Sequence, residues 1–109
     1  MDKNQEHPGL LKRTVTFKFK ESVPEEQRTE AAVRFSKLPD TIPEIAHFEW
    51  GTDVSIDGLS GGFTHIFSLV FKSAKDRNTY VYHKDHEAFK QFVIPLLEGV
   101  NVVDYWTKL

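Results

Sequence analysis

The clearest structural signal in the chain is Leu11–Lys20, LKRTVTFKFK, where apolar side chains alternate with polar ones. Lysines and threonines fill one parity, and the other holds the apolar residues Leu11, Val15, Phe17 and Phe19. A period of two with Val, Thr and Phe is typical of a β-strand that is buried on one face. Arg13 lies on the apolar parity, where a charge is costly unless it is paired or borders a cavity.

Outward from this strand, the pattern divides the rest of the chain into five more elements. Apolar residues at intervals of three and four predict helices, and alternation predicts strands. The expected elements are a helix that opens at Ser22–Glu25 and ends at Pro39–Asp40, strands over Ile45–Val54 and Phe63–Phe71, a short helix over Ser73–Tyr82, a longer helix over Asp85–Leu97 and a last strand over Val100–Trp106. Ser22 is expected to cap the first helix, whereas Pro95 and Gly99 are expected to end the last one.

The element order β-α-β-β-α-β predicts an α+β, ferredoxin-like fold with a four-stranded antiparallel sheet and helices on one face. The other face would expose Trp50 or its neighbours, Ile66, Val70 and parts of the last strand. An apolar patch of that size is uncommon on a monomer, so we expect a homodimer that packs through the open sheet face.

Length and composition exclude several classes of protein. The 109 residues fit one domain, here expected over 11–109 after a polar, disordered arm over 1–10. A net charge of −2 argues against nucleic-acid binding, and no apolar run approaches the ~20 residues of a membrane span. No signal peptide is visible in the first residues, so the localisation stays open, with the cytoplasm as the default unless a leader was removed.

Several stretches together resemble the stress-responsive dimeric α/β-barrel (Dabb) domain family. They keep the order of that family and cover nearly the whole chain from about Leu10: Phe17–Lys20, Ile42-Pro43, Trp50–Ser55, Gly62–Phe67, Tyr80–His86 and Val102–Tyr105. The resemblance implies a ferredoxin-like subunit and a homodimer whose two sheets form a barrel. It implies little about chemistry, because fold alone does not define function.

One branch of the family, the plant polyketide cyclases, implies a specific pair of residues. These enzymes use a Tyr and a His in a pocket between sheet and helices to close a ring by an intramolecular aldol reaction. Their Tyr-x-x-His-x-x-His stretch corresponds here to Tyr80 and His86. Two positions depart from the branch, since Arg13 stands where many relatives have a His and Lys84 replaces a Pro.

Each candidate site residue also has a purely structural interpretation. His86 can be a base with a pKa near neutrality, or it can cap the last helix while Tyr80 packs in the core. Arg13 can hold a ligand carboxylate or carbonyl, or it can extend to solvent and pair with a nearby acid. His65, on the aromatic parity of its strand, can line the same pocket.

The pair His83-x-x-His86 has a spacing that can hold a metal ion, but it straddles a helix start and lacks an obvious third ligand, so no metal site is expected.

The sequence therefore predicts a stress-response-type homodimer with a small apolar pocket that binds an aromatic or polyketide-like molecule. The expected ligand contacts are Arg13, His65, Tyr80, His83 and His86. The alternatives are a cyclase-like or cofactor-free oxygenase-like enzyme that uses His86 and Tyr80, or a purely structural stress protein. No cofactor, nucleic-acid or membrane partner is expected.

Overall fold

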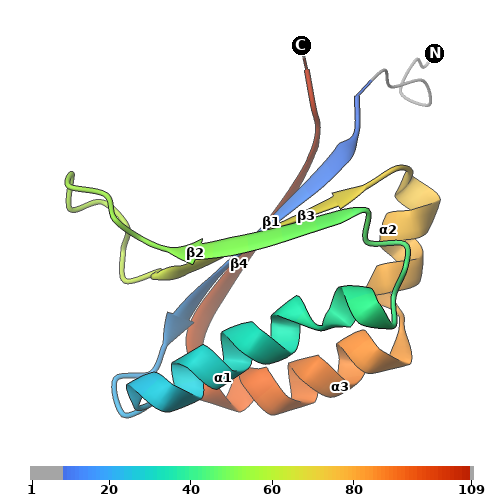
Figure 1. Ribbon diagram of the computed structural model, residues 1–109. Coiled ribbons are helices and arrows are strands. Elements are labelled where there is room, and N and C mark those ends of the chain that lie inside the picture. The colour runs from blue at the N-terminus through green and yellow to red at the C-terminus, as the bar shows by residue number, and fades with distance from the viewer. Residues whose placement is uncertain (1–8, 109) are drawn as a thin grey trace.

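The computed structural model describes residues 9–108, which form four strands and three α-helices (Figure 1). Residues 1–8 of the expected N-terminal arm lie outside the described residues. The elements are β1 Leu11–Phe19, α1 Glu25–Ser36, a 3-10 turn η2 Leu38–Asp40, β2 His47–Thr52, β3 His65–Phe71, α2 Ala74–Val81, α3 Lys84–Val93, a 3-10 turn η3 Ile94–Leu96 and β4 Leu97–Trp106.

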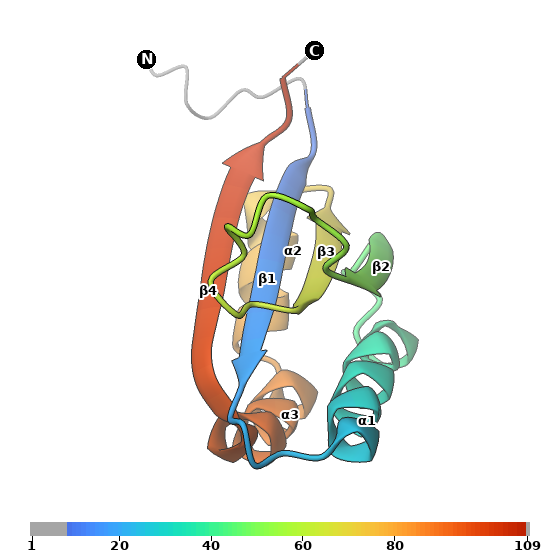
Figure 2. The ribbon, with the colours of Figure 1, turned by 90° about the vertical axis from the view of Figure 1, so that its left-hand side faces the viewer.

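The four strands form one antiparallel sheet in the order β2-β3-β1-β4. The central strand β1 pairs with β3 on one side and with β4 on the other, and Arg13 lies opposite Leu69 and Asp104. The helices cover one face of this sheet, and Figure 2 shows α2 behind it. The predicted α+β, ferredoxin-like arrangement is confirmed.

Several predicted element ends need correction. Pro24, not Ser22, is the N-cap residue of α1, and no side chain caps that helix end. Ser73 caps α2, because its hydroxyl accepts a hydrogen bond from the Asp76 N–H at 3.0 Å. Pro95 does end the last helix early, since α3 stops at Val93 and a 3-10 turn follows.

Gly99 is not a helix stop, because it lies within β4 beside the register shift at Lys18/Phe19. The ring of Phe63 packs close over this glycine, and a Cβ added there would lie 3.3 Å from it. A close approach of this kind favours glycine inside a strand. The glycine signal was therefore recognised in the sequence but assigned to the wrong element.

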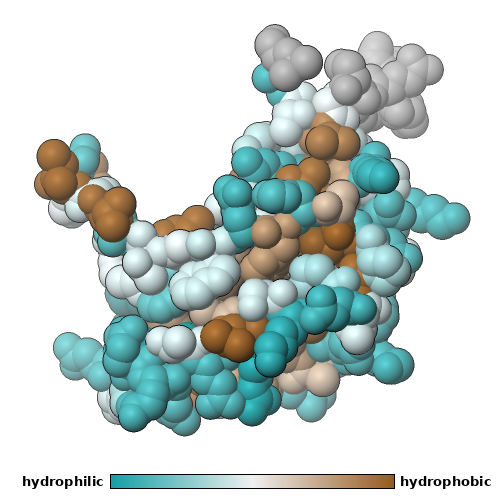
Figure 3. All heavy atoms as spheres, in the orientation of Figure 1, coloured by the Kyte–Doolittle hydropathy of each residue, from teal (hydrophilic) through white to brown (hydrophobic). Residues whose placement is uncertain are grey.

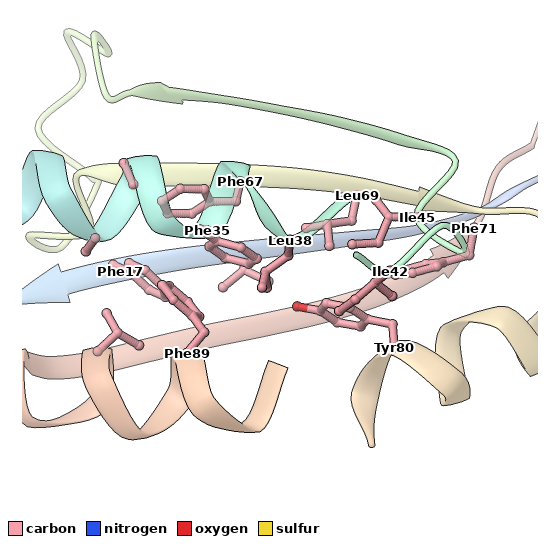
Figure 4. Close-up of a cluster of buried hydrophobic side chains, with 14 of the residues drawn as sticks. Phe17, Phe35, Leu38, Ile42, Ile45, Phe67, Leu69, Phe71, Tyr80 and Phe89 are labelled. Carbon is pink, nitrogen blue, oxygen red and sulfur yellow. The ribbon is translucent and has the colours of Figure 1, made fainter. Parts of the chain in front are cut away.

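The core lies between the sheet and the helices and is dominated by aromatic rings (Figure 4). Phe35 of α1 lies at its centre, with ring centroids 4.6 Å from Phe67 of β3 and 4.8 Å from Phe89 of α3. Trp50 also belongs to this covered side, because it pairs with Phe67 in the register and its ring stacks on that residue. The alternative that Trp50 lies on the open face is therefore wrong.

The open face carries the other parity of each strand. Val103 and Tyr105 of β4 remain 50% and 45% exposed there, whereas Ile66 and Val70 of β3 are half-buried. The loop of residues 53–64 between β2 and β3 projects from this side, and it crosses in front of the sheet in Figure 2. Its apolar side chains stand clear of the body of the molecule in Figure 3; they belong to Val54, Ile56 and Leu59.

Candidate functional site

A cavity of about 210 Å³ lies between the β1–β4 side of the sheet and helices α2 and α3. Most of its wall is apolar, and its lining residues are Arg13, Val15, Phe17, Phe35, Tyr80, Val81, His86, Phe89, Lys90, Val93, Ile94, Leu97, Val100 and Val102. An apolar cavity of about 150 Å³ is enough to hold benzene. The cavity is therefore large enough for one substituted ring.

The edge strand β4 forms the outer wall of the cavity. The register sets Val102 opposite Val15 and Val100 opposite Phe17, so both valines point toward the helices. No further strand of residues 9–108 pairs with β4, and Val100, Val102 and Ile94 remain about half exposed at the rim. The rim of the cavity along this edge is therefore exposed to solvent.

Tyr80 is held in the wall by its neighbours on three elements. Its ring packs on Phe71 of β3, stacks on His86 of α3 at a centroid distance of 4.2 Å, and lies 5.7 Å from the Arg13 guanidinium carbon. The side chain is almost fully buried, and in Figure 4 the hydroxyl points from α2 along the core.

The Tyr80 hydroxyl makes no hydrogen bond with any residue from 9 to 108, so it is available to a ligand. Burial raises the pKa of Tyr80 well above its ordinary value, although the nearby charge of Arg13 opposes that shift. The hydroxyl therefore keeps its proton and can donate a hydrogen bond.

His86 is fixed in one tautomer by its contact with the backbone. Its Nδ1 lies 3.0 Å from the carbonyl oxygen of Val81, which can only accept a hydrogen bond. Nδ1 therefore carries the ring proton and donates a hydrogen bond to that oxygen. In the neutral ring Nε2 then keeps a free lone pair. Burial lowers the pKa of His86, the Val81 bond opposes this, and the charges of Lys90 and Arg13 lower it further. His86 is therefore neutral at pH 7 and can accept a proton at Nε2.

Arg13 borders the cavity and pairs with an acid, as the structural interpretation expected, but it does not extend to solvent, since only 13% of its side chain is exposed. Its Nε and Nη2 donate to the two carboxylate oxygens of Asp104 at 2.9 and 3.1 Å, and Arg77 Nη1 donates to the same carboxylate at 2.9 Å. Burial raises the pKa of Asp104, but the hydrogen bonds and charges of both arginines outweigh it and hold that pKa below its ordinary value. Asp104 is therefore ionised near neutral pH.

The structure brings Arg13, Tyr80 and His86 together, whereas His65 and His83 do not line the cavity. His65 lies nearer the β2 edge, where its ring packs on Phe19 and stacks on Trp50. His83 is the N-cap residue of α3, because its Nδ1 accepts the Asp85 N–H at 3.0 Å. Its ring is therefore used to start the helix that carries His86.

Asp104 and Arg77 were not anticipated from the sequence, although one signal for Asp104 was present. Asp104 shares its parity with Val100 and Val102 in the last strand, so it is an acid on an apolar face, just as Arg13 is a base on one. Opposite charges directly across an antiparallel pair stabilise the sheet. Arg77 carries no comparable signal, since its contact depends on how α2 packs.

Within residues 9–108, no three His, Cys, Asp or Glu side chains lie close enough together to hold a metal ion. None of the described helices is long and apolar enough to cross a membrane.

These features define an α+β protein of ferredoxin-like topology with an apolar cavity beneath its sheet. The chain belongs to the stress responsive A/B barrel domain family, whose profile matches residues 11–107. The resemblance to the Dabb family is thereby confirmed.

Two relatives span most of the chain. The stress-response A/B barrel domain-containing protein HS1 of Arabidopsis thaliana is 34% identical over 101 residues, which are 93% of each chain. Olivetolic acid cyclase of Cannabis sativa is 28% identical over 95 residues, which are 87% of this chain and 94% of that protein.

Two solved structures are similar in shape. The Arabidopsis thaliana protein At3g17210 has a TM-score of 0.86 and 32% identity, and the match covers 91% of this chain and 96% of that one. A dimeric ferredoxin-like protein of unknown function from Thermobifida fusca has a TM-score of 0.76 and 21% identity, with 98% and 100% covered. At that identity the second likeness shows the fold alone.

Acidification is expected to destabilise the protein partly through His86. Burial lowers the pKa of His86 in the folded state, so below pH ~6.5 the unfolded chain binds the proton more readily and the free energy of unfolding falls. Urea denaturation at pH 7 and pH 5 measures this loss. His86→Gln should lose less free energy of unfolding over that interval than the unmodified protein, with the remainder due in part to His65, whose pKa burial also lowers. If both proteins lose the same free energy of unfolding between pH 7 and pH 5, His86 does not have a lowered pKa in the folded state.

Proposed function

We propose that this protein is a homodimer that binds a small, mainly apolar molecule, aromatic or polyketide-like, in the cavity beside Tyr80. The observation that carries this proposal is the cavity itself. Its wall is largely aliphatic and aromatic, and its few polar groups converge at Tyr80, His86 and Arg13. A largely apolar pocket with a few placed polar groups is the usual composition of a small-molecule site.

The polar end of the cavity gives such a ligand one preferred orientation. A carbonyl or hydroxyl group of the ligand accepts a hydrogen bond from Tyr80, whose own hydroxyl is otherwise without a partner within residues 9–108. The apolar part of the ligand then lies between Phe89 and the valines of β4. The relationship to olivetolic acid cyclase of Cannabis sativa supports a polyketide-like ligand.

The dimer part of the proposal is supported by the open sheet face. Val103 and Tyr105 are about half exposed there, and the loop of residues 53–64 extends beyond the same face with its apolar side chains in solvent (Figure 3). Packing a second copy against this face removes both surfaces from water, and a structural neighbour from Thermobifida fusca is described as dimeric.

Ligand binding is tested with a matched pair of substitutions. Val102 lines the cavity, whereas Val33 on α1 is similarly exposed and does not line it. Val102→Phe should fill the cavity and abolish the rise in melting temperature that small aromatic ligands produce in the unmodified protein, because only a ligand that binds the folded state stabilises it. Val33→Phe should keep that rise. If no member of a set of aromatic and polyketide-like ligands stabilises the unmodified protein, the alternative of a purely structural stress protein is favoured.

Dimerisation is tested by placing a charge on the open face. Val103→Glu should leave the fold intact and convert the protein to a monomer, because the interface would have to bury two unpaired carboxylates. Light scattering after size exclusion should give twice the chain mass of 12.6 kDa for the unmodified protein and one chain mass for the variant. Val33→Glu, with the same change on α1, should remain dimeric. A monomeric unmodified protein at micromolar concentration would refute the dimer.

A second candidate function is cyclase-like catalysis, which the state of His86 favours. A free Nε2 on a neutral ring can remove a proton from the carbon next to a ligand carbonyl, and the enolate carbon then attacks a second carbonyl of the same molecule. The π bond of that carbonyl opens to an alkoxide, which takes the proton back from the His86 imidazolium and leaves a hydroxyl group and a neutral His86. The Tyr80 hydroxyl donates a hydrogen bond to the enolate oxygen as negative charge develops there.

Cyclase-like catalysis predicts that the loss of the His86 base slows ring closure. With a linear poly-β-keto thioester as substrate, ring closure followed by mass spectrometry should be faster than without protein. Replacement His86→Gln should slow the catalysed reaction by roughly a hundredfold or more, the typical contribution of a general base. The control His47→Gln removes an exposed histidine of β2 and should keep the full rate. Identical rates with and without the protein would exclude this reaction for the substrate used.

A further inference from the structure

We propose that the ligand of this cavity is a small aromatic carboxylate, and that the Arg13 guanidinium binds its carboxylate group. This inference rests on the proposed function, since it assigns a charge to the ligand of the same cavity. It follows from the charges of Arg13, Asp104 and Arg77, from the unused edge of Arg13, and from the rings that line the cavity.

The first observation is an excess of positive charge next to the cavity, where Arg13 lines the wall and binds Asp104, which in turn binds Arg77. Two guanidinium groups share the single carboxylate of Asp104, so the three side chains carry a net charge of +1. Only 13% of the Arg13 side chain, 22% of Asp104 and 26% of Arg77 are exposed. A charge that is held away from water is costly unless an opposite charge accompanies it, and an anionic ligand supplies that charge.

The second observation is the unused edge of Arg13. Asp104 occupies the Nε–Nη2 edge of the guanidinium, and Nη1 has no hydrogen-bond partner among the described residues. The planar guanidinium has a second edge, formed by its two terminal nitrogens, whose spacing matches a carboxylate. Arg13 lines the cavity, so the proposal places the ligand carboxylate on this edge, where the bonds to Asp104 can remain in place.

The remaining charges near the cavity do not cancel this excess. Lys90 lines the cavity at its rim, and its ammonium lies 3.2 Å from the Glu87 carboxylate, so that pair is neutral. His86 is also neutral at pH 7, and the positive charges of Lys90 and Arg13 contribute to the lowering of its pKa. A ligand anion therefore meets a net positive wall on the Arg13 side.

The third observation concerns the apolar part of the ligand. Phe17, Phe35 and Phe89 line the cavity on the side of the core, and their rings offer edges and faces to another aromatic ring. The volume of about 210 Å³ suits one ring with short substituents rather than a long chain. Together with the guanidinium, these walls match a benzoate-type molecule.

The test compares 4-methylbenzoate with 4-methylbenzamide, which has nearly the same shape and no charge. Isothermal titration at pH 7 should show that the unmodified protein binds the benzoate roughly tenfold more tightly than the amide, as one added charge-assisted hydrogen bond implies. Arg13→Gln should remove this preference while amide binding persists. Arg77→Gln, which does not touch the cavity, should reduce the preference because the Arg13–Asp104 pair then becomes neutral.

The control variant is Arg28→Gln, since Arg28 bonds to the carbonyls of Val23 and Lys20 and does not line the cavity. It removes a positive charge elsewhere and should keep the benzoate preference. Equal affinities of the unmodified protein for the two probes would overturn the anionic ligand and leave the binding proposal intact. A preference that survives in Arg13→Gln would overturn the role of Arg13. If neither probe binds, both this inference and the aromatic-binding proposal fail.

Discussion

The pleat of the central strand β1 is the constraint on which the rest of the structure depends. β1 pairs on both sides, so neither edge can shift without breaking a row of backbone hydrogen bonds, and its side chains are bound to alternate faces. The parity that buries Phe17 and Phe19 also carries Arg13 to the covered face. A guanidinium there needs a partner, and the register places Asp104 directly opposite. The polar end of the cavity is thus a consequence of the same alternation that builds the core.

The cavity exists because the side chains around it differ in size. Near α1 the rings of Phe35, Phe67 and Phe89 are in mutual contact and fill the layer between sheet and helices. Toward β4 the facing residues are the smaller Val100 and Val102, and the cavity lies between them and α3. Protein interiors are otherwise close-packed, so space left between large and small side chains is available for a ligand. The hydroxyl of Tyr80 borders this space and can donate a hydrogen bond to whatever occupies it.

The fold could be predicted because the alternation and helical spacing that indicate it lie within short segments. The site could be predicted only in part, because it depends on how distant strands pair and how the helices pack on them. Alternation within each strand identified the order of elements, and it grouped Trp50 correctly with Phe48. It could not say which face that group takes, since the pairing of Trp50 with Phe67 joins distant segments. The resemblance to known cyclases indicated Tyr80 and His86, which do meet. It gave no indication of Arg77, whose contact with Asp104 requires the packed position of α2.

The long edge strand β4 bears on how the protein aggregates at high concentration or when it is partly unfolded. Its 10 residues carry aliphatic side chains on both faces of the pleat, and its outer backbone groups have no strand partner within residues 9–108. An edge of this kind is a template on which another chain can add a strand and begin a fibril. A charged residue that points inward from an edge strand opposes such growth, because an added sheet would have to cover the charge. Asp104, which Arg13 and Arg77 hold in place, is a charge of this kind on β4.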